Sequence, residues 1–494
     1  MRHHFLLCVC LSFLSSVPTY AQKETTTWYF GRNAGFDFSQ GSPVSIEQNG
    51  LTRLGIGIVV QSDPQTGQLL FYSDGEQVWN RNHQLMPHGQ QLRGFFFLPQ
   101  GVLAVPVPGQ ARQYYLFTMQ SSQLTPATLS YSRLDMGLDA GLGDVVETEK
   151  NQSLVGTFSH QLTAIPHTNG QAYWVIAPEW STNQFFIYLV DVQGISLSHK
   201  LAIGLAQTPK IDFDGGYLKP SPDGKKLAYS IGGNFALSLF DFDATTGLLS
   251  NYLNLGTLFN ESGISFSPDN SKLYVSHFDV VDQEKRLRAV ISQYDLAAGS
   301  GAAIAASRLS IIANNPTTNI RADEQGANGY YTFQLGPDGR LYGNSGYEDR
   351  FLPRLPNQHY MYVINYPNRR GFACDVQAQP FSFPDSNVGP GLPNFIQSSF
   401  NGLEPKQEPP LPCADIALVL FPNPASRTVQ LQVPTACFSP YQLRLYNAVG
   451  QFIFQTNIST ALSAPIDIGN LAAGVYYFQS RFSDKVITIK LLKE

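Results

Sequence analysis

One turn motif recurs along this chain and restricts its fold more than any other feature. "SPDG" at residues 221–224 returns as "SPDN" at 267–270 and as "GPDG" at 336–339, each time between two apolar runs. Pro pre-sets the backbone for the second position of a type I turn, and Gly or Asn tolerates the exit from it. The flanking residues alternate between apolar and polar, as in strands with one buried face. The sequence therefore predicts a β-hairpin that is used repeatedly.

Turn-centred hairpins follow one another at intervals that match the blades of a β-propeller. They are centred near Pro64, Pro108, Pro166, Pro222, Pro268 and Pro337. A further blade is expected from the two ends of the repeat region, with an inner strand at 391–397 and outer strands at 28–38 and 43–47. Such a closure removes the exposed edges of an open circle of sheets. We predict an all-β propeller over residues 22–400, with seven blades favoured and six as the alternative.

Composition agrees with an all-β chain. Aromatic residues make up 12% of the 494 residues and charged residues only 14%, with 42 Gly and 32 Pro. Strands favour aromatic residues and tight turns favour Gly and Pro, whereas a disordered chain has fewer aromatic residues. The formal net charge is −5, without a cluster of Lys and Arg. We therefore expect no nucleic-acid partner.

Residues 1–21 have the features of a secretory signal peptide. Arg2 precedes the apolar run "FLLCVCLSFLSSV", and the segment ends with a small residue before Gln22. This run is too short to span a bilayer, and no later segment is apolar for long enough. We expect cleavage between Ala21 and Gln22 and an exported mature chain without a transmembrane helix.

The composition changes after residue 400. Residues 401–413 carry four prolines and are expected to form an extended linker, while residues 414–494 contain short alternating strands typical of a small β-sandwich.

Three cysteines remain after removal of the signal peptide. In an oxidising compartment, a Cys413–Cys437 bridge would fix the start of the last domain and leave Cys374 unpaired.

The last domain carries an ordered set of motifs. They are "LFPNPAS" at 420–426, "LRLYNAVGQ" at 443–451, "IDIGNLAAGVYYFQ" at 466–479 and "KVITIKLLK" at 485–493. Together they resemble the type A C-terminal sorting domain of the type IX secretion system of some Gram-negative bacteria. The resemblance implies the type IX machinery as a partner and export through the periplasm and across the outer membrane. It also implies removal of the domain, followed by release or attachment to surface lipopolysaccharide. The alternative interpretation is a plain β-sandwich binding module.

The front of the chain carries a second resemblance. "WYFGRNAGFDF", "GYLKPSPDGKKLAY" and "GLPNFIQSSF" are similar to segments of a group of exported propeller-like proteins that have the same sorting domain. The Ser-Pro-Asp-Gly hairpins also resemble the repeats of TolB-like and WD40-like propellers. These resemblances imply an architecture only, and no catalytic residue is carried over from them.

Patterns of catalysis are absent from the sequence. There is no Gly-x-Ser-x-Gly elbow and no His-Glu-x-x-His pair, so we predict no catalytic residue and no cofactor. Asp212 with Asp214, and Asp241 with Asp243, place two carboxylates on one side of a strand, where they could ligate Ca²⁺ together with backbone carbonyls. The same pairs suit turns in which Asp side chains accept backbone hydrogen bonds. The turn interpretation is favoured because neither pair completes a calcium loop.

One polar stretch is the candidate binding site. It brings together Trp79, Asn80, Arg81, Asn82 and His83, and a second loop carries Trp180. An aromatic face beside planar hydrogen-bonding groups suits a sugar ring or a loop of a partner protein. The alternative interpretation is a turn between blades, in which Trp79 packs between sheets.

Three functions follow from these observations, in order of preference. The first is a recognition module at the cell surface or in the medium that binds a glycan or protein, because propeller loops present binding residues on a rigid support. The second is a structural component of the cell surface, of adhesion or of the motility apparatus. The third is an extracellular hydrolase or lyase acting on polysaccharide or peptide, because a fold alone does not settle function.

Overall fold

Strands dominate the computed structural model of this chain, as the prediction of an all-β fold requires. The structure describes residues 23–47, 55–121, 125–206, 216–230, 236–280, 286–311, 320–321, 328–347, 358–378, 380–383, 388–403, 418–433, 441–459, 462–482 and 485–494. Its single described α-helix is α1 (Gly301–Ala306), and the short 3₁₀ helices are η1 (Asp139–Gly141), η2 (Glu147–Glu149), η3 (Gly371–Cys374) and η4 (Gln397–Phe400). None of the helices in these ranges is long and apolar enough to cross a membrane.

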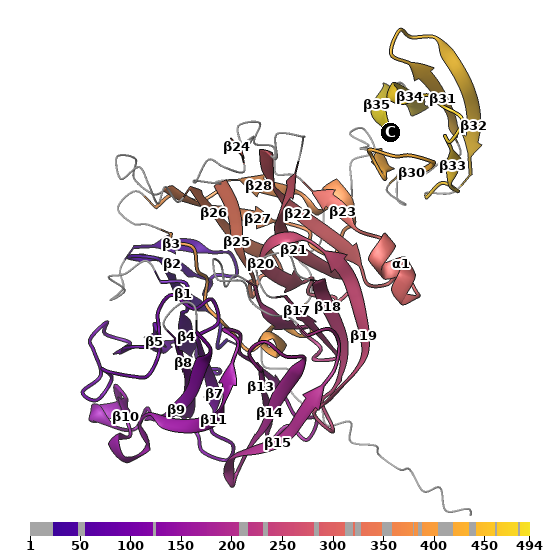
Figure 1. The fold of residues 1–494 in the computed structure, drawn as a ribbon. Coiled ribbons are helices and arrows are strands. Elements are labelled where there is room, and N and C mark those ends of the chain that lie inside the picture. Colours follow the sequence, from indigo (N-terminus) through magenta and orange to yellow (C-terminus); the bar gives the residue numbers. More distant parts are fainter. Residues whose placement is uncertain are drawn as a thin grey trace, which may run out of the picture.

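Seven antiparallel sheets, here called sheets 1 to 7, follow one another in chain order (Figure 1). Sheet 1 contains β1 (Thr27–Phe30), β2 (Ala34–Asp37) and β3 (Val44–Ile46), and sheet 2 contains β4 (Val59–Ser62), β5 (Leu69–Ser73) and β6 (Val78–Asn80). Sheet 3 contains β7 (Val102–Pro106), β8 (Gln113–Gln120), β9 (Ala127–Asp135), β10 (Asp144–Val145) and β11 (Gln152–Phe158).

The remaining four sheets pair consecutive strands, except that β24 of sheet 6 pairs with β22. Sheet 4 contains β12 (Thr163–Pro166), β13 (Tyr173–Pro178), β14 (Gln184–Asp191) and β15 (Gly194–Ala202), and sheet 5 contains β16 (Leu218–Pro220), β17 (Lys226–Tyr229), β18 (Ala236–Asp243) and β19 (Leu248–Thr257). Sheet 6 contains β20 (Phe259–Phe266), β21 (Lys272–Val280), β22 (Arg286–Asp295), β23 (Leu309–Ile311) and β24 (Ile320–Arg321). Sheet 7 contains β25 (Asn328–Leu335), β26 (Leu341–Tyr347), β27 (Gln358–Ile364) and β28 (Val376–Ala378).

Sheet 1 closes the ring by packing between the last sheet and the second. The Trp28 ring lies 5.6 Å from the ring of Tyr342 in sheet 7, edge to face, and the Tyr29 ring lies 4.9 Å from that of Tyr72 in sheet 2. Figure 1 shows this arrangement, with the indigo strands of sheet 1 next to the orange strands of sheet 7. The described residues therefore form a β-propeller with seven blades, which confirms the favoured prediction.

The repeated motif forms the predicted turn in each hairpin. In sheet 5 the Gly224 amide donates to the Ser221 carbonyl at 2.9 Å, and the Ser221 hydroxyl donates to the Asp223 carboxylate at 2.6 Å. Gly224 has a φ of +71°, which a residue with a side chain adopts at a cost. The Asp223 amide also donates to the Asn270 side chain of the corresponding turn in sheet 6, at 3.0 Å. The turns thus connect neighbouring blades as well as closing their own hairpins.

The expected inner strand at 391–397 is a correction. These residues form no strand, and residues 388–400, here called the closing segment, instead contact several sheets near the middle of the ring. The Asn394 amide N–H donates to the Ile58 carbonyl at 2.7 Å, and its side chain donates to the carbonyls of Val102 and Leu162 at 3.1 and 3.3 Å. Those three carbonyls belong to sheets 2, 3 and 4 or to the residues just before them. Pro393 has no N–H for a strand ladder, and a position between sheets satisfies Asn394 better than pairing with one strand.

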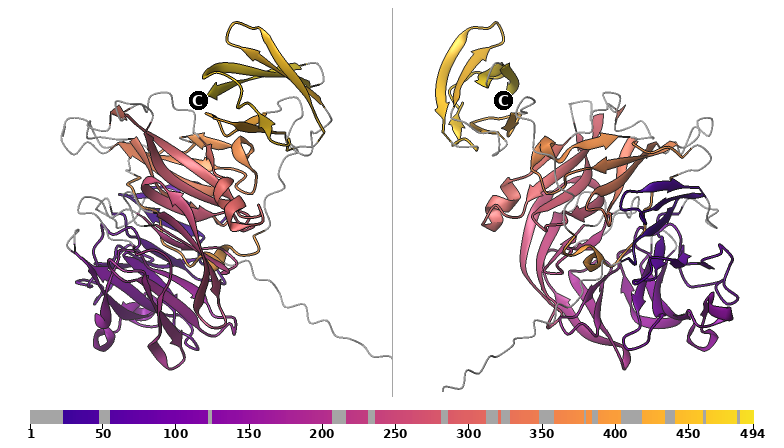
Figure 2. Two further views of the ribbon diagram at one scale, coloured as in Figure 1. Left: turned by 45° about the vertical axis from the view of Figure 1, so that its right-hand side comes forward. Right: turned by 180° about the vertical axis from the view of Figure 1, so that it is seen from behind.

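The C-terminal residues form a separate two-sheet domain (Figure 2). One sheet contains β29 (Val419–Phe421), β30 (Thr428–Gln432) and β33 (Ile466–Asp467), and the other contains β32 (Phe452–Ile458), β31 (Tyr441–Asn447), β34 (Gly474–Phe482) and β35 (Lys485–Lys493). Its core is its own and includes Val429, Leu431, Leu443, Leu445 and Leu491, all buried. This is the predicted β-sandwich. One contact with the propeller is that of the Arg370 guanidinium, whose central carbon lies 4.8 Å from the centre of the Phe421 ring.

Several predictions fall on residues outside the described ranges. They concern the signal peptide at 1–21 with its cleavage between Ala21 and Gln22, most of the linker, Cys413 and Cys437, and Asp212 and Asp214. These stay predictions. Cys374 is described, buried and free, and burial raises the pKa of its thiol to about 12.

Candidate functional site

The predicted aromatic site forms the tip of a hairpin in sheet 2. The Trp79 side chain is stacked on Tyr72, with ring centres 5.3 Å apart and planes 11° apart, and only 6% of the residue is exposed. The Asn80 side-chain oxygen accepts hydrogen bonds from the amides of Asn82 and Gln84, at 2.9 and 3.2 Å. These contacts are those of a packed strand end with a capped turn.

The other predicted residues lie around this tip or on another sheet. The Arg81 guanidinium donates to the Gly141 carbonyl at 2.6 Å, and His83 Nδ1 lies 3.2 Å from the Tyr72 hydroxyl. Burial lowers the pKa of His83. Trp180 follows β13 in sheet 4 and is half-buried, with its ring 5.4 Å from that of His160. The structure therefore brings Trp79 to His83 together and leaves Trp180 with a different blade, and ligand binding by these residues stays a prediction.

The base of the same hairpin opens into a depression of about 420 Å³. We call it the amide-rich depression. It is lined by Glu76, Gln77, Gln90, Gln91, Leu92, Gly94, Phe95, Gln120 and Ser121. The lining residues come from the turn between β5 and β6, from the connection between β6 and β7, and from the end of β8. The three segments meet at the same end of sheets 2 and 3, because neighbouring strands of an antiparallel sheet turn back at the same edge.

Backbone contacts hold the two sides of this depression together. The Val78 amide donates to the Gly89 carbonyl at 2.8 Å, and the Leu92 amide donates to the Glu76 carbonyl at 3.0 Å. A Cβ atom on Gly94 would lie 2.0 Å from the carbonyl oxygen of Gly75, so this close approach requires glycine. These backbone contacts therefore fix the Cα positions from which the glutamine side chains extend.

The chemistry of the depression comes from four glutamines. Each side-chain amide of Gln77, Gln90, Gln91 and Gln120 offers two donors and one acceptor, and none of them hydrogen-bonds to another described residue. The ring of Phe95 is half-buried and packs edge to face on Phe96, with centres 5.5 Å apart. Glu76 is the one charged side chain of the lining. The arrangement can form hydrogen bonds with hydroxyl groups beside an apolar ring surface.

The site residues predicted from the sequence lie close to those that line the depression but do not include them. The pair Gln90–Gln91 and the run from Phe95 to Phe97 directly follow the polar stretch that carries Trp79. Three consecutive aromatic residues outside a strand pattern are a usable signal, since a loop has no general need of them. Gln120 carried no signal, because only the packing of sheet 3 against sheet 2 brings it to the depression.

In the acidic pair that the structure describes, Asp243 caps a turn, whereas Asp241 lies within β18 and bonds to the strands on either side of it. The Asp241 carboxylate accepts from the Lys226 ammonium at 2.7 Å and from the Asn251 side chain at 2.8 Å. The Asp243 carboxylate accepts from the Thr245 amide at 2.8 Å and from the Thr246 hydroxyl at 2.8 Å. No group of three or more His, Cys, Asp or Glu side chains suited to a metal occurs among the described residues.

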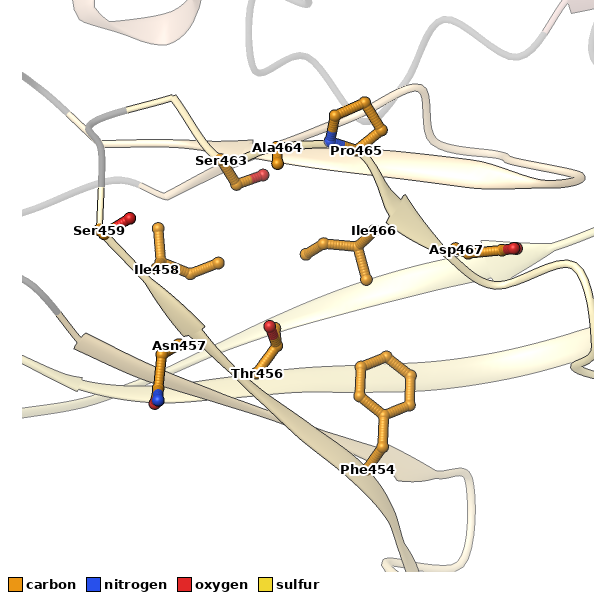
Figure 3. A pocket seen from close by; sticks show the side chains of 10 residues that line it. All are labelled: Phe454, Thr456, Asn457, Ile458, Ser459, Ser463, Ala464, Pro465, Ile466 and Asp467. Atoms are coloured by element: carbon orange, nitrogen blue, oxygen red, sulfur yellow. The ribbon is translucent and has the colours of Figure 1, made fainter.

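A second hollow lies in the C-terminal domain between β32 and β33, with a volume of about 440 Å³. Figure 3 shows Ile458 of β32 and Ile466 of β33 pointing toward each other across it, while Asn457 points away. Phe454 and Thr456 also line it from β32. The lining of this hollow is of mixed character, because five of its ten residues are polar, namely Thr456, Asn457, Ser459, Ser463 and Asp467.

Comparison with known proteins identifies the last domain. Residues 419–494 match the family described as the secretion system C-terminal sorting domain. No curated protein matches the chain. Similar solved structures include the Cps50 (Swd1) β-propeller domain of Myceliophteria thermophila, 10% identical with a TM-score of 0.35, covering 65% of this chain and 93% of that one. A TolB structure from Agrobacterium tumefaciens is 15% identical with a TM-score of 0.28, covering 56% and 83%. Residues 419–494 are thus a secretion system C-terminal sorting domain, carried behind a seven-bladed β-propeller.

Proposed function

We propose that this chain is an exported recognition protein whose propeller binds a neutral glycan in the amide-rich depression. The sorting domain supports export, and the motif order within it supports the type IX route to the cell surface or the medium. Removal of the sorting domain, followed by release or by attachment to lipopolysaccharide, belongs to this proposal. The Ca²⁺ alternative at the Asp pairs has no part in it.

The observation that carries the proposal is the set of four glutamine amides beside Phe95. Sugar hydroxyls need both donors and acceptors, and the apolar face of a sugar ring packs on an aromatic side chain. Each hydrogen bond contributes about 1 kcal/mol net and the ring contact about as much, so four amides and one ring give about 5 kcal/mol, which corresponds to a dissociation constant of about 0.2 mM. Such binding is weak for one site and is best measured on immobilised polysaccharide.

Charge favours a neutral ligand. Glu76 is the one charged residue of the lining, and the whole chain has a formal net charge of −5. A polysaccharide rich in uronate or sulfate would bring like charge to this surface and would be repelled at low salt. A neutral glycan meets no such repulsion.

The test is retention of the mature chain on immobilised neutral polysaccharides, with an acidic polysaccharide in parallel. We expect saturable binding to at least one neutral glycan, reduced about tenfold by Phe95→Ala and severalfold by Gln120→Ala. Gln84→Ala is the matched control, since Gln84 is an exposed glutamine at the opposite end of the same hairpin. Its binding should equal that of the wild type.

Three results would contradict the proposal. Binding that survives Phe95→Ala but is lost in Arg81→Ala or Asn82→Ala would place the site at the hairpin tip. A stable protein partner with no glycan retention would favour the structural component. Release of soluble fragments from the polysaccharide would favour the hydrolase or lyase.

A further inference from the structure

Lys219 is a buried amine where three parts of the propeller meet. It lies on β16 of sheet 5, and only 3% of the residue is exposed. Its Nζ donates to the side-chain oxygen of Gln334, on β25 of sheet 7, at 2.7 Å. The side chain of Gln397, in the closing segment, donates to the same oxygen at 3.3 Å. One oxygen atom therefore connects sheet 5, sheet 7 and the closing segment.

A second set of bonds ties the neighbour of Lys219 to the closing segment. The Gln100 side chain accepts from the Leu218 amide at 2.6 Å and donates to the Leu218 carbonyl at 3.0 Å. The same side chain donates to the Asn394 side-chain oxygen at 3.4 Å. Neutral amides thus hold residues 394–397 against β16, and Lys219 is the one ionisable member of this group of side chains.

The environment of Lys219 disfavours its charged form. Burial alone lowers the pKa of the amine from 10.5 to about 7. An ammonium has three N–H donors, and among the described residues Lys219 has one acceptor, the oxygen of Gln334, and no carboxylate in ion-pair range. Protonation therefore places a charge in a site that stabilises it poorly.

The other ionisable groups on the elements packed against Lys219 differ from it, either in the direction of their pKa shift or in having a charged partner. Tyr217 and Tyr229 are buried, and their pKa values are raised, that of Tyr217 to about 12. Lys226 of β17 pairs with Asp241. Glu24 accepts a hydrogen bond from Ser399 in the closing segment, at 2.9 Å, and burial raises its pKa. No ionisable side chain lies between Thr163 and Pro166 of β12, in the described side chains of β20 and β25, or in η4.

We propose that Lys219 is a pH-sensitive lock on the closing segment, which the ring holds tightly when the amine is neutral and loosely when it is protonated. The ordinary pKa of the amine, 10.5, applies when the segment opens and water reaches Lys219, and the pKa of about 7 applies in the closed ring. Closure therefore gains stability as the pH rises from about 7 to about 10.5. Below about pH 7 the amine is protonated in both states, so Lys219 weakens closure by a constant amount that does not change with pH. The sorting domain follows the closing segment in the sequence, so the lock acts on the segment that precedes this domain.

Hydrogen exchange of the closing segment tests the lock in the full mature chain. After correction for intrinsic exchange, protection of residues 394–400 in the wild type should rise with pH, approaching tenfold per unit between pH 7.5 and 9.5. In Lys219→Met the rise should disappear, while Glu24 and both tyrosines stay in place. Lys225→Met is the matched control, because 79% of the Lys225 side chain is exposed on the neighbouring turn, and it should behave as the wild type. Parallel curves for the wild type and Lys219→Met would overturn the proposal.

A second measurement tests the proposal even if Lys219→Met does not fold. The ¹³Cε resonances of the lysines in the folded wild type report each titration directly, and Gln334→Leu identifies the signal of Lys219 by its shift. One lysine with a midpoint near pH 7 supports the lock. Midpoints at about 10 or above for every lysine would overturn it.

Discussion

At the scale of single residues, neutral amides inside the ring contribute more to stability than ion pairs on its rim. The Arg133–Glu149 pair, at 2.7 Å, is about one-third exposed on both sides, and pairs of this kind contribute about 0–1 kcal/mol. Asn394 is buried, and its side chain satisfies the carbonyls of Val102 and Leu162. Removing it leaves those buried acceptors without a partner, which costs about 1–3 kcal/mol for each group.

This difference predicts unequal effects of two alanine substitutions. Asn394→Ala should lower the free energy of unfolding by about 2–4 kcal/mol, and Arg133→Ala by less than about 1 kcal/mol. Urea denaturation of the mature chain, followed by tryptophan fluorescence, measures both. Equal losses for the two variants would mean that the closing segment does not hold the ring through Asn394.

At the scale of elements, the hairpin that ends in the amide-rich depression depends on two glycines facing each other. Gly75 has a φ of +87°, and Gly94 leaves no room for a side chain against the Gly75 carbonyl. The turn between β5 and β6 and the connection to β7 are therefore held at one spacing. That spacing sets the distance between the segments that carry Gln77 and Gln91 on the two sides of the depression.

Gly94→Ala should disturb this element and its site together. A Cβ atom 2.0 Å from a backbone oxygen forces the two segments apart, so we expect a loss of about 2–4 kcal/mol in stability and loss of glycan retention. Gly137→Ala is the control, because its Cβ would meet the Asp135 carboxylate at 3.0 Å, where a side chain can move away. Thermal unfolding and the retention assay measure both effects. Retention that is unchanged in Gly94→Ala would show that the depression is not the binding site.

The elements also show what the sequence can and cannot predict. The Ser-Pro-Asp-Gly hairpins were predicted correctly because turn chemistry is local, and Ser221 and Gly224 make their bonds within a few residues. The inner strand at 391–397 was wrong because the place of Asn394 depends on carbonyls of three sheets far away in the sequence. The depression was missed for the same reason, since Gln91 and Gln120 are neighbours only in the fold.

At the scale of the whole molecule, the ring joins the two ends of the propeller sequence. Sheet 1 packs against sheet 7 through Trp28 and Tyr342, and the core that contains them also includes Leu392, Phe395 and Phe400. The sorting domain has a core of its own. The propeller therefore needs the closing segment and can be separated from the sheets of the sorting domain.

Two shortened chains test this division. A chain of residues 22–403 should fold with a cooperative thermal transition, whereas a chain of residues 22–387 should lose that transition because Asn394 and the apolar residues around it are missing. Circular dichroism with calorimetry distinguishes the two. A cooperative transition of equal midpoint in both chains would contradict a structural role for the closing segment.

The central position of the closing segment also gives the protein an order of assembly. Each of the seven sheets pairs strands that lie close together in the sequence, but the core that joins sheet 1 to sheet 7 also needs apolar residues of the closing segment. The closing segment shortly precedes the sorting domain in the sequence, so in a chain made from its N-terminus the last residues of the propeller core are added shortly before the sorting domain. A molecule with an open propeller therefore differs from one with a closed propeller in the closing segment, which is the part of the propeller nearest to the sorting domain in the sequence.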